Sequence, residues 1–195
     1  MRFIRNAVLL GVWVLLSLPA AKATTLEQWD TTRLTRASQW VHVGEVIQKW
    51  SAWSPNEKMI YTYVKMRVDQ TLKGDEKREI LIRVPGGQAQ GYGMLVHGVA
   101  NFAPGERALV FLHQDPDGAP SVVGMTQGKF RIYRNLSTGE DMALFRAPRQ
   151  VEFYTRGTNG RVRHLVSSQV ERRLPLAELI QEIRSAVETE PRVAH

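Results

Sequence analysis

The sequence predicts a mainly β domain: a small, closed or nearly closed antiparallel barrel with a short N-terminal helix and an amphipathic C-terminal helix. Apolar and polar residues alternate along residues 60–72, which is the period of a half-buried strand. In residues 40–50 the apolar phase flips at Gly44, and a glycine at such a flip is typical of a β-bulge that bends a strand. Residues 107–113 are apolar on both faces, as expected of a central strand that is covered on both sides.

Residues 1–23 have the three parts of a secretory signal peptide. Arg2 and Arg5 supply the positive charge, and residues 7–18 form an apolar run. Ala21 and Ala23 then provide the small-x-small pattern that a signal peptidase recognises. A membrane anchor is the alternative, but a spanning helix needs about 20 apolar residues. We therefore predict cleavage after Ala23 and a single mature domain of residues 24–195.

Composition excludes several classes of chemistry and of partner. Cysteine is absent, which excludes disulfides, thiolate metal sites, a cysteine nucleophile and the lipidated cysteine of a lipoprotein. The formal net charge of +7 falls by three when Arg2, Arg5 and Lys22 leave with the signal peptide. The chain has no run of five Lys or Arg residues, so a dedicated nucleic-acid patch is not expected. These features predict a periplasmic or secreted protein with no nucleic-acid partner and no membrane span after cleavage.

The first half of the mature chain is predicted to contain one helix and three strands. Apolar residues three to five apart in a polar stretch predict a helix in residues 26–39, capped by Asp30 or Thr31. The bent strand and strand 60–72 follow, separated by a Ser-Pro-Asn turn. Residues 79–84 carry Ile, Ile and Val on one side, and we expect them to pair back on strand 60–72 as an antiparallel hairpin.

The second half is predicted to consist of strands followed by a helix. After the covered strand, short strands are expected at 122–125, 129–133, 151–154 and 161–166, the last two as a hairpin. Apolar residues then recur at helical spacing. We expect a helix at 175–189 that packs on the barrel as a lid.

The glycine-rich segment 85–93 is the first candidate binding site. A phosphate-binding loop also follows a strand, but here Tyr92 stands where such a loop needs Lys, and no helix begins after it. We predict a flexible rim of the barrel, where such folds place their partners. The alternative is geometric, with glycines that make a tight turn and a slack connection. The candidate partner-binding residues are Gly86, Gly87, Gln88, Gln90 and Tyr92.

An aromatic and basic face is the second candidate. Aromatic rings with cationic neighbours on a curved sheet can stack on bases, on sugars or on the peptide of a partner. The alternative is that these residues only cover an exposed sheet, or that they lie under the terminal helix. The side chains expected on one side of strand 60–72, with two tryptophans just before it, are Tyr61, Tyr63, Lys65, Arg67, Trp50 and Trp53.

Residues that could carry catalysis are scattered. The carboxylate pairs Asp115/Asp117 and Glu140/Asp141 sit in turns, where solvation accounts for them. Neither an H-E-x-x-H helix motif nor a G-x-S-x-G or S-x-x-K nucleophile motif occurs. We therefore predict no catalytic residue, no metal site and no cofactor. The histidines without metal-ligand spacing are His42, His97, His113 and His164.

The order of short motifs resembles a group of exported bacterial proteins of unknown function. The matching segments lie between Ala37 and Tyr133 and read VHVGEVIQ, YTYVKMRVDQTLKG, ILIRVPGG, PGERALVFL and GMTQGKFRIY. In that group a V-x-G-x-V strand leads to Y-T, L-K-G, V-P-G-G, G-E-x-x-L-V-F-L and Q-G-K-F. The resemblance brings no known activity.

The same strands are more distantly similar to the netrin-like module, the five-stranded OB-type barrel of tissue inhibitors of metalloproteinases. That similarity implies an OB-like barrel in this chain. Inhibitors of that family reach the protease zinc with an N-terminal Cys, whereas here the predicted N-terminus is Thr24 and the chain has no Cys. The similarity therefore extends to the barrel and not to the inhibitory residues.

Together these observations predict an exported, non-catalytic binding module that recognises a protein or a cell-envelope component, with a protease as one kind of partner. Two alternatives stay open. One is an envelope hydrolase or metal-dependent enzyme that uses His42, His97 or His113. The other is a structural subunit of an exported assembly.

Overall fold

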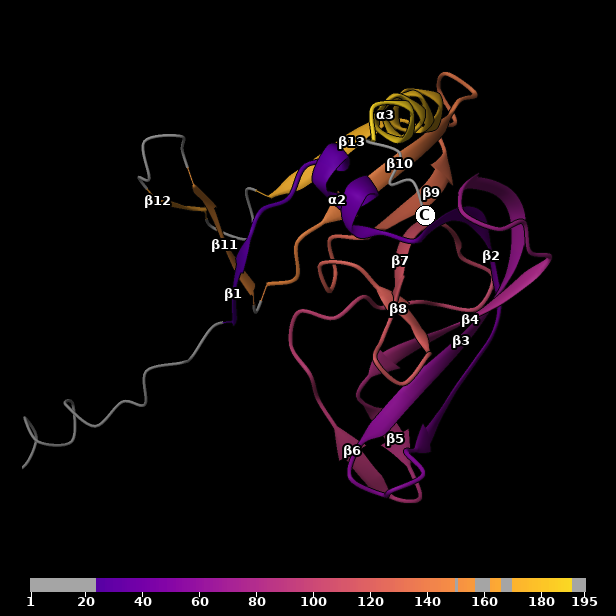
Figure 1. Ribbon diagram of the computed structural model, residues 1–195, viewed down its shortest axis with the longest axis vertical. Coiled ribbons are helices and arrows are strands. Elements are labelled where there is room, and N and C mark those ends of the chain that lie inside the picture. Colours follow the sequence, from indigo (N-terminus) through magenta and orange to yellow (C-terminus); the bar gives the residue numbers. More distant parts are fainter. Residues whose placement is uncertain (1–23, 150, 157–161, 166–169, 191–195) are drawn as a thin grey trace, which may run out of the picture.

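A computed structural model describes residues 24–149, 151–156, 162–165 and 170–190 (Figure 1). The fold within these ranges is mainly β with a short and a long helix, as the sequence predicts. In chain order the elements are β1 (Thr24–Glu27), α2 (Thr31–Ala37), β2 (Trp40–Trp53), β3 (Ile60–Lys73), β4 (Glu79–Pro85), β5 (Gly87–Ala89), β6 (Tyr92–Met94), β7 (Arg107–Gln114), β8 (Pro120–Val122), β9 (Lys129–Arg134), β10 (Asp141–Arg146), β11 (Val151–Arg156), β12 (Val162–Leu165), β13 (Glu171–Pro175) and α3 (Leu176–Glu188).

The main sheet is antiparallel and strongly curled into a half-barrel, with the strand order β13-β10-β9-β7-β2-β3-β4 (Figure 1). The long strand β2 bends because its pairing with β3 shifts register at three places, one of them between Val43 and Gly44. The predicted bulge at Gly44 is therefore confirmed. The bend lets β2 pair with β7 over its first residues and with β3 along its length.

β3 and β4 form the predicted hairpin. On β3 the buried side chains of Thr62, Val64 and Met66 alternate with more exposed neighbours, as the period of two predicts. Ile80 and Ile82 of β4 are buried on the same side as these residues. One side of this hairpin is therefore core, and the other faces solvent.

The curl of the sheet brings β4 beside β8, which pairs with the end of β7. In the described part of the chain, no ladder of backbone hydrogen bonds joins β4 to β8. Contacts between side chains, and not strand pairing, therefore hold β4 and β8 together. We call the line where β4 meets β8 the seam.

Two hydrophobic cores lie on opposite sides of β7. Leu109 and Phe111 point into the first core, and Val110 and Leu112 point into the second, which fills the inside of the curl. All four side chains are almost completely buried. This arrangement explains why the sequence of β7 is apolar on both faces.

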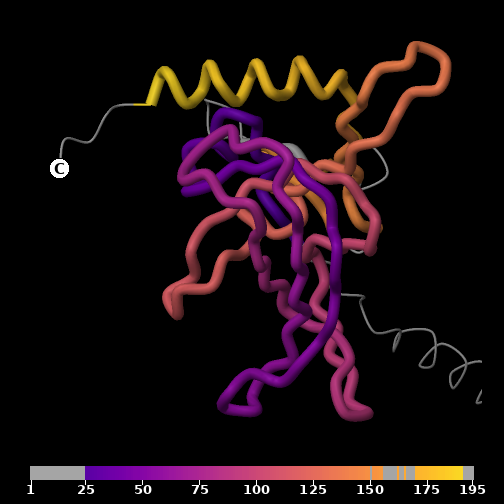
Figure 2. Tube along the Cα trace, turned by 90° about the vertical axis from the view of Figure 1, so that its right-hand side faces the viewer, coloured from indigo at the N-terminus to yellow at the C-terminus, as the bar shows by residue number. Residues whose placement is uncertain are grey.

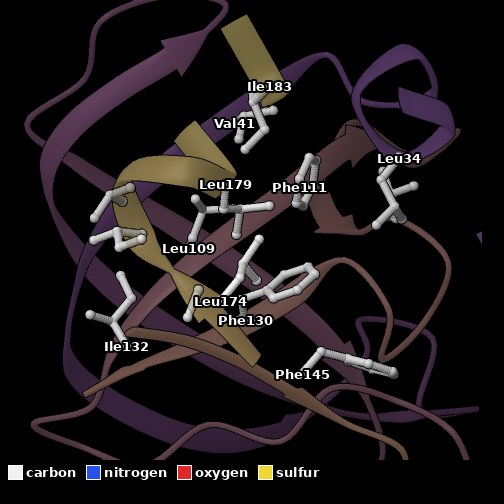
Figure 3. Close-up of a cluster of buried hydrophobic side chains, with 14 of the residues drawn as sticks. Leu34, Val41, Leu109, Phe111, Phe130, Ile132, Phe145, Leu174, Leu179 and Ile183 are labelled. Carbon is white, nitrogen blue, oxygen red and sulfur yellow. The ribbon is translucent and has the colours of Figure 1, made fainter. Parts of the chain in front are cut away.

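The first core lies between the sheet and α3 (Figure 3). Leu179 and Ile183 on the apolar stripe of α3 are fully buried in it. The rings of Phe111 and Phe130 meet there with centroids 6.2 Å apart. The C-terminal helix therefore covers the sheet as the predicted lid.

A second sheet, with the order β1-β11-β12, corrects the predicted N-terminal helix. Residues 24–27 form β1, which pairs in parallel with β11, so the helix begins only at Thr31. Asp30 caps this helix by accepting a hydrogen bond from the backbone N–H of Arg33, as one of the two predicted caps. β11 and β12 form the last predicted hairpin, whose turn at 157–161 lies outside the described residues.

The predicted flexible rim is in fact a regular β-hairpin of β5 and β6 at the end of the molecule opposite α3 (Figures 1 and 2). Its two-residue turn consists of Gln90 and Gly91, both with positive φ. The strands β10 and β13, which pair with one another at the edge of the main sheet, are also absent from the sequence prediction. Both corrections concern short strands whose partners are set by the tertiary fold.

Candidate functional site

The solvent side of β2, β3 and β4 carries four of the predicted partner-binding residues. Tyr61, Tyr63, Lys65 and Arg67 alternate with the buried side chains of β3. Trp50 lies opposite Tyr63 in the β2–β3 ladder, and their rings stack with centroids 5.6 Å apart. We call this side of the three strands the outer face.

The centre of the outer face is apolar and accessible. Trp50 keeps 38% of its surface exposed, and Leu81 of β4 keeps 43%. Leu81 lies opposite Lys65, and Tyr63 stands in the next row of the same ladders. Helix α3 packs on the first core and leaves these side chains uncovered. The alternative that the terminal helix covers this face is therefore wrong.

The basic residues of the outer face are paired with acids. Lys65 Nζ lies 2.6 Å from a carboxylate oxygen of Glu79, and a guanidinium nitrogen of Arg67 lies 2.6 Å from Glu45. Each cation is therefore balanced by a carboxylate on a neighbouring strand. The outer face is an aromatic and apolar centre with paired charges at its border, and not the cationic surface that the sequence suggested.

Trp53 does not lie on the outer face. It stands opposite Ile60, which is buried, and its ring meets that of Tyr92 edge-on with centroids 5.7 Å apart. This contact joins the far end of β2 to the β5–β6 hairpin. The structure therefore divides the predicted residues between two places on opposite sides of the sheet.

Gly86 and Gly87 have a packing role. Gly86 has a φ of +92°, and a Cβ there would lie 2.9 Å from the carbonyl oxygen of Met94. Gly87 has a φ of +138°, and a Cβ there would lie 2.6 Å from the hydroxyl oxygen of Thr62. Because glycine alone avoids both problems, these residues let the hairpin close on β2 and β3. Close packing therefore explains why these two positions are glycines, and their part in partner binding stays a prediction.

The other predicted residues of the hairpin remain accessible. Gln88 and Gln90 are exposed, and Tyr92 keeps 66% of its surface exposed. Gln90 has a φ of +51°, which is uncommon for a residue with a side chain. Strained residues of this kind are enriched at functional sites. A role for these residues in recognition stays a prediction.

A cleft of about 740 Å³ opens on the side of the sheet away from the outer face. It lies between the buried side of β3 and β4, the β5–β6 hairpin and the segment 95–102. Gly86, Gly87 and Gln88 line it, so three of the predicted residues share this place. We call it the inner cleft.

A group of charged side chains holds the seam together. Arg83 of β4 donates hydrogen bonds to Asp115 at 3.0 Å and to the two carboxylate oxygens of Asp117 at 2.5 and 2.7 Å. Its guanidinium also lies 4.4 Å from the centre of the Tyr61 ring. Hydrogen bonding to Arg83 lowers the pKa of Asp117 below its usual value. The two aspartates are therefore not merely solvated turn residues, which corrects the sequence interpretation.

Ser121, His113 and Asp115 meet beside the seam, but not as a catalytic triad. Ser121 Oγ donates to Asp115 Oδ1 at 2.7 Å, and His113 Nε2 lies 2.7 Å from the same Oγ. In a triad the histidine accepts the serine proton, and the aspartate holds the other ring nitrogen. Here Asp115 Oδ1 lies 3.5 Å from Nε2, the same ring nitrogen that faces Oγ, so the aspartate does not hold the other ring nitrogen.

The other histidines lie apart from His113. His42 is fully buried opposite Val110, with Nδ1 3.1 Å from Thr71 Oγ1 and with Nε2 unpaired within the described chain. Burial, aided by the charge of Lys77, lowers the pKa of His42 to about 4. His97 lines the inner cleft, and no three metal-ligating side chains gather among the residues that the structure describes. The side chain of His164 is outside the described part.

We expect Arg83→Met to lower the free energy of unfolding by about 2 kcal/mol, because it leaves Asp115 and Asp117 at the seam without their counter-charge. Arg134→Met is the matched control, since Arg134 is exposed and its partner Asp141 keeps a second ion pair with Arg107. A change below about 0.5 kcal/mol is expected for the control. Urea unfolding of both variants measures the difference, and equal losses would show that Arg83 does not hold the seam.

Comparison with known proteins does not place the chain in a family. No protein-family model matches the sequence, and no curated protein matches it. Among the described residues, no helix is both long and apolar enough to cross a membrane. The function is therefore inferred from the fold and from the geometry of the two candidate surfaces.

Proposed function

We propose that the protein is an exported, non-catalytic binding module that recognises another protein through its outer face. The main support is the accessible cluster of Trp50, Tyr63 and Leu81, which is set in paired strands and bordered by ion pairs. Aromatic and apolar anchors inside a polar border are the composition of energetically important protein interfaces.

The outer face needs no rearrangement before it binds. β3 is paired on both edges, with β2 on one side and β4 on the other. Trp50 and Tyr63 restrict one another by stacking. A surface whose side chains are already ordered loses little conformational entropy on binding, so more of the contact energy appears as affinity.

The charge pattern favours a protein over a nucleic acid. Binding to phosphates gains its free energy from cations that displace counterions. Lys65 and Arg67 are already balanced by Glu79 and Glu45, so they offer little of that free energy. At the border of a protein interface, the same pairs contribute to the choice of partner and of its orientation.

Export is supported by the signal-like residues 1–23. Residues 24–27 pair with β11, and cleavage after Ala23 would keep this pairing. Proteins of the periplasm or of the extracellular space, proteases among them, are the partners that such a module meets.

The hydrolase alternative has less support. Asp115 and the Ser121 hydroxyl face the same ring nitrogen of His113, so this group lacks the arrangement of nucleophile, base and orienting carboxylate that a triad needs. In the structural-subunit alternative, the outer face would instead bind a second copy of the chain or another subunit of the assembly. Identifying the protein that the outer face captures separates these cases.

We expect the combined change Trp50→Ser and Leu81→Ser to reduce capture of a specific protein from the native envelope fraction at least about tenfold. Both side chains are partly exposed, so the free energy of unfolding should change by less than about 1 kcal/mol. Quantitative mass spectrometry of the proteins retained on the immobilised chain measures capture, and circular dichroism checks folding.

Leu136→Ser is the matched control, because Leu136 is an apolar residue that is 95% exposed in the turn between β9 and β10. It should leave capture unchanged. Equal capture by the double variant and the parent protein would overturn the proposal. If the captured protein is the chain itself, the structural-subunit alternative is correct.

A further inference from the structure

The inner cleft is a second candidate site, built from parts that the outer face does not use. Its volume of about 740 Å³ is in the range of pockets that enclose small ligands and peptide segments. Met94, Val96 and Val99, which are partly exposed, give it an apolar wall.

Lys49 places one positive charge at the inner cleft. Its ammonium group donates to Asn101 Oδ1 at 3.2 Å and to the carbonyl oxygen of Phe102 at 2.9 Å, which are both neutral acceptors. Lys49 forms no ion pair with a carboxylate of the described chain, whereas nearby Lys129 is paired with Glu106 at 2.5 Å. An ammonium group has three donors, so Lys49 keeps one for a ligand and keeps its full charge.

The hairpin offers the inner cleft a strand edge. Within the described ranges β6 pairs only with β5, so one edge of β6 keeps its backbone donors and acceptors. Gly93 and Met94 of β6 line the cleft. Leu95 follows them, lines the cleft and keeps 80% of its surface exposed. An accessible leucine beside an open strand edge is a typical place for an extended peptide to bind.

We propose that the inner cleft binds the carboxyl-terminal segment of a peptide chain, with the terminal carboxylate on Lys49 and an apolar last side chain against the wall of Met94, Val96 and Val99. A single unbalanced cation matches one carboxylate. The apolar wall matches the side chain, and the open edge of β6 matches the backbone of an extended peptide. A fatty acid has no backbone that could pair with this edge, which favours the peptide.

The inner cleft and the outer face lie on opposite sides of the same strands, so this site does not depend on the proposed function of the outer face. A peptide terminus could come from any protein that the module meets. The test therefore uses mixed sequences, and it compares two chemical forms of the carboxyl end.

Two pools of random hexapeptides, one with free carboxyl ends and one with carboxamide ends, are passed over the immobilised protein. We expect the acid pool to be retained about tenfold better, because a charge-assisted contact with Lys49 is lost in the amide. Sequencing of the retained peptides by mass spectrometry should show apolar last residues. Equal retention of the two pools, or retention of neither above bare resin, would overturn the inference.

Variants identify the cation responsible. Lys49→Met should remove the preference for acid, and Lys49→Arg should keep it. Arg184→Met makes the same charge change at an exposed position of α3 and should also keep the preference. Leu95 is at an exposed position that tolerates a polar residue. Leu95→Asp should lower the preference for acid peptides, because the new carboxylate repels theirs. This variant tests the inference even if Lys49→Met does not fold.

A Lys49→Met protein that folds and still prefers acid peptides would contradict the inference. The combined Trp50→Ser and Leu81→Ser protein should keep the full preference for acid peptides. A failure of the outer face and a failure of the inner cleft are therefore distinguishable.

Discussion

Replacing Gly44 by alanine is expected to lower the free energy of unfolding by roughly 3 kcal/mol or to prevent folding. A Cβ at this position would lie much closer to the carbonyl oxygen of Arg67, on the neighbouring strand, than van der Waals contact allows. That oxygen belongs to the backbone, so β3 would have to move away from β2 at the bulge. Circular dichroism and urea unfolding of the variant measure the loss.

Gly93→Ala is the matched control for this change. Gly93 also lies in a strand, but the nearest atom to its Cβ would be Gln88 Cγ at 3.9 Å, which is ordinary contact. We expect its stability to stay within about 0.5 kcal/mol of the parent protein. Similar stability of Gly44→Ala and the parent protein would mean that β2 does not bend as described.

Lowering the pH from 7 to 4 is expected to remove about 3 kcal/mol of stability through His42 alone. Burial and the charge of Lys77 lower the pKa of His42 in the folded protein from 6.5 to about 4. Below pH 6.5 the unfolded chain therefore takes up a proton that the folded chain does not. The stability that depends on His42 is complete above pH 6.5, falls between pH 6.5 and 4, and changes no further below pH 4.

His42→Leu should remove this pH dependence. The variant is expected to be less stable than the parent protein at pH 7, where it loses the hydrogen bond to Thr71, and more stable at pH 4. Asp117 and Asp141, whose pKa values are lowered by Arg83 and Arg107, titrate alike in both proteins, so the difference isolates His42. Parallel loss of stability in both proteins on acidification would show that His42 is not held neutral.

The parts of the fold that the sequence predicts are those with a local signal. The period of two in β3 and the apolar stripe of α3 each require only neighbouring residues to identify the buried side. Gly44 was identifiable because the apolar phase changes at that position. β7 was identifiable because both of its sides are apolar, as two cores require.

The missed elements depend on distant partners. β1 is four residues long, and its pairing with β11 joins Thr24 to Val151. The charged sequence of β13, with Glu171 and two arginines, forms a strand because β10 lies beside it. The turn of Gln90 and Gly91 carries only a weak hairpin signal, since Gln seldom adopts a positive φ.

The candidate surfaces also combine features with a local sequence signal and features that depend on distant residues. Alternation along β3 was enough to place Tyr61 and Tyr63 on one side of a strand. The sequence could not show that Glu45 and Glu79 neutralise the cations there, because those acids come from two other strands. The link between Arg83 and Asp115 is likewise a product of the curl, and no local pattern encodes it.

The most direct test of the binding-module proposal is site-specific photocrosslinking in the native cell. A photoreactive phenylalanine analogue in place of Trp50 would lie at the centre of the outer face, and the same analogue in place of Leu136 would lie at an exposed turn. We predict one light-dependent crosslinked protein from position 50 and none from position 136. No product from position 50, or the same product from both positions, would contradict recognition through the outer face.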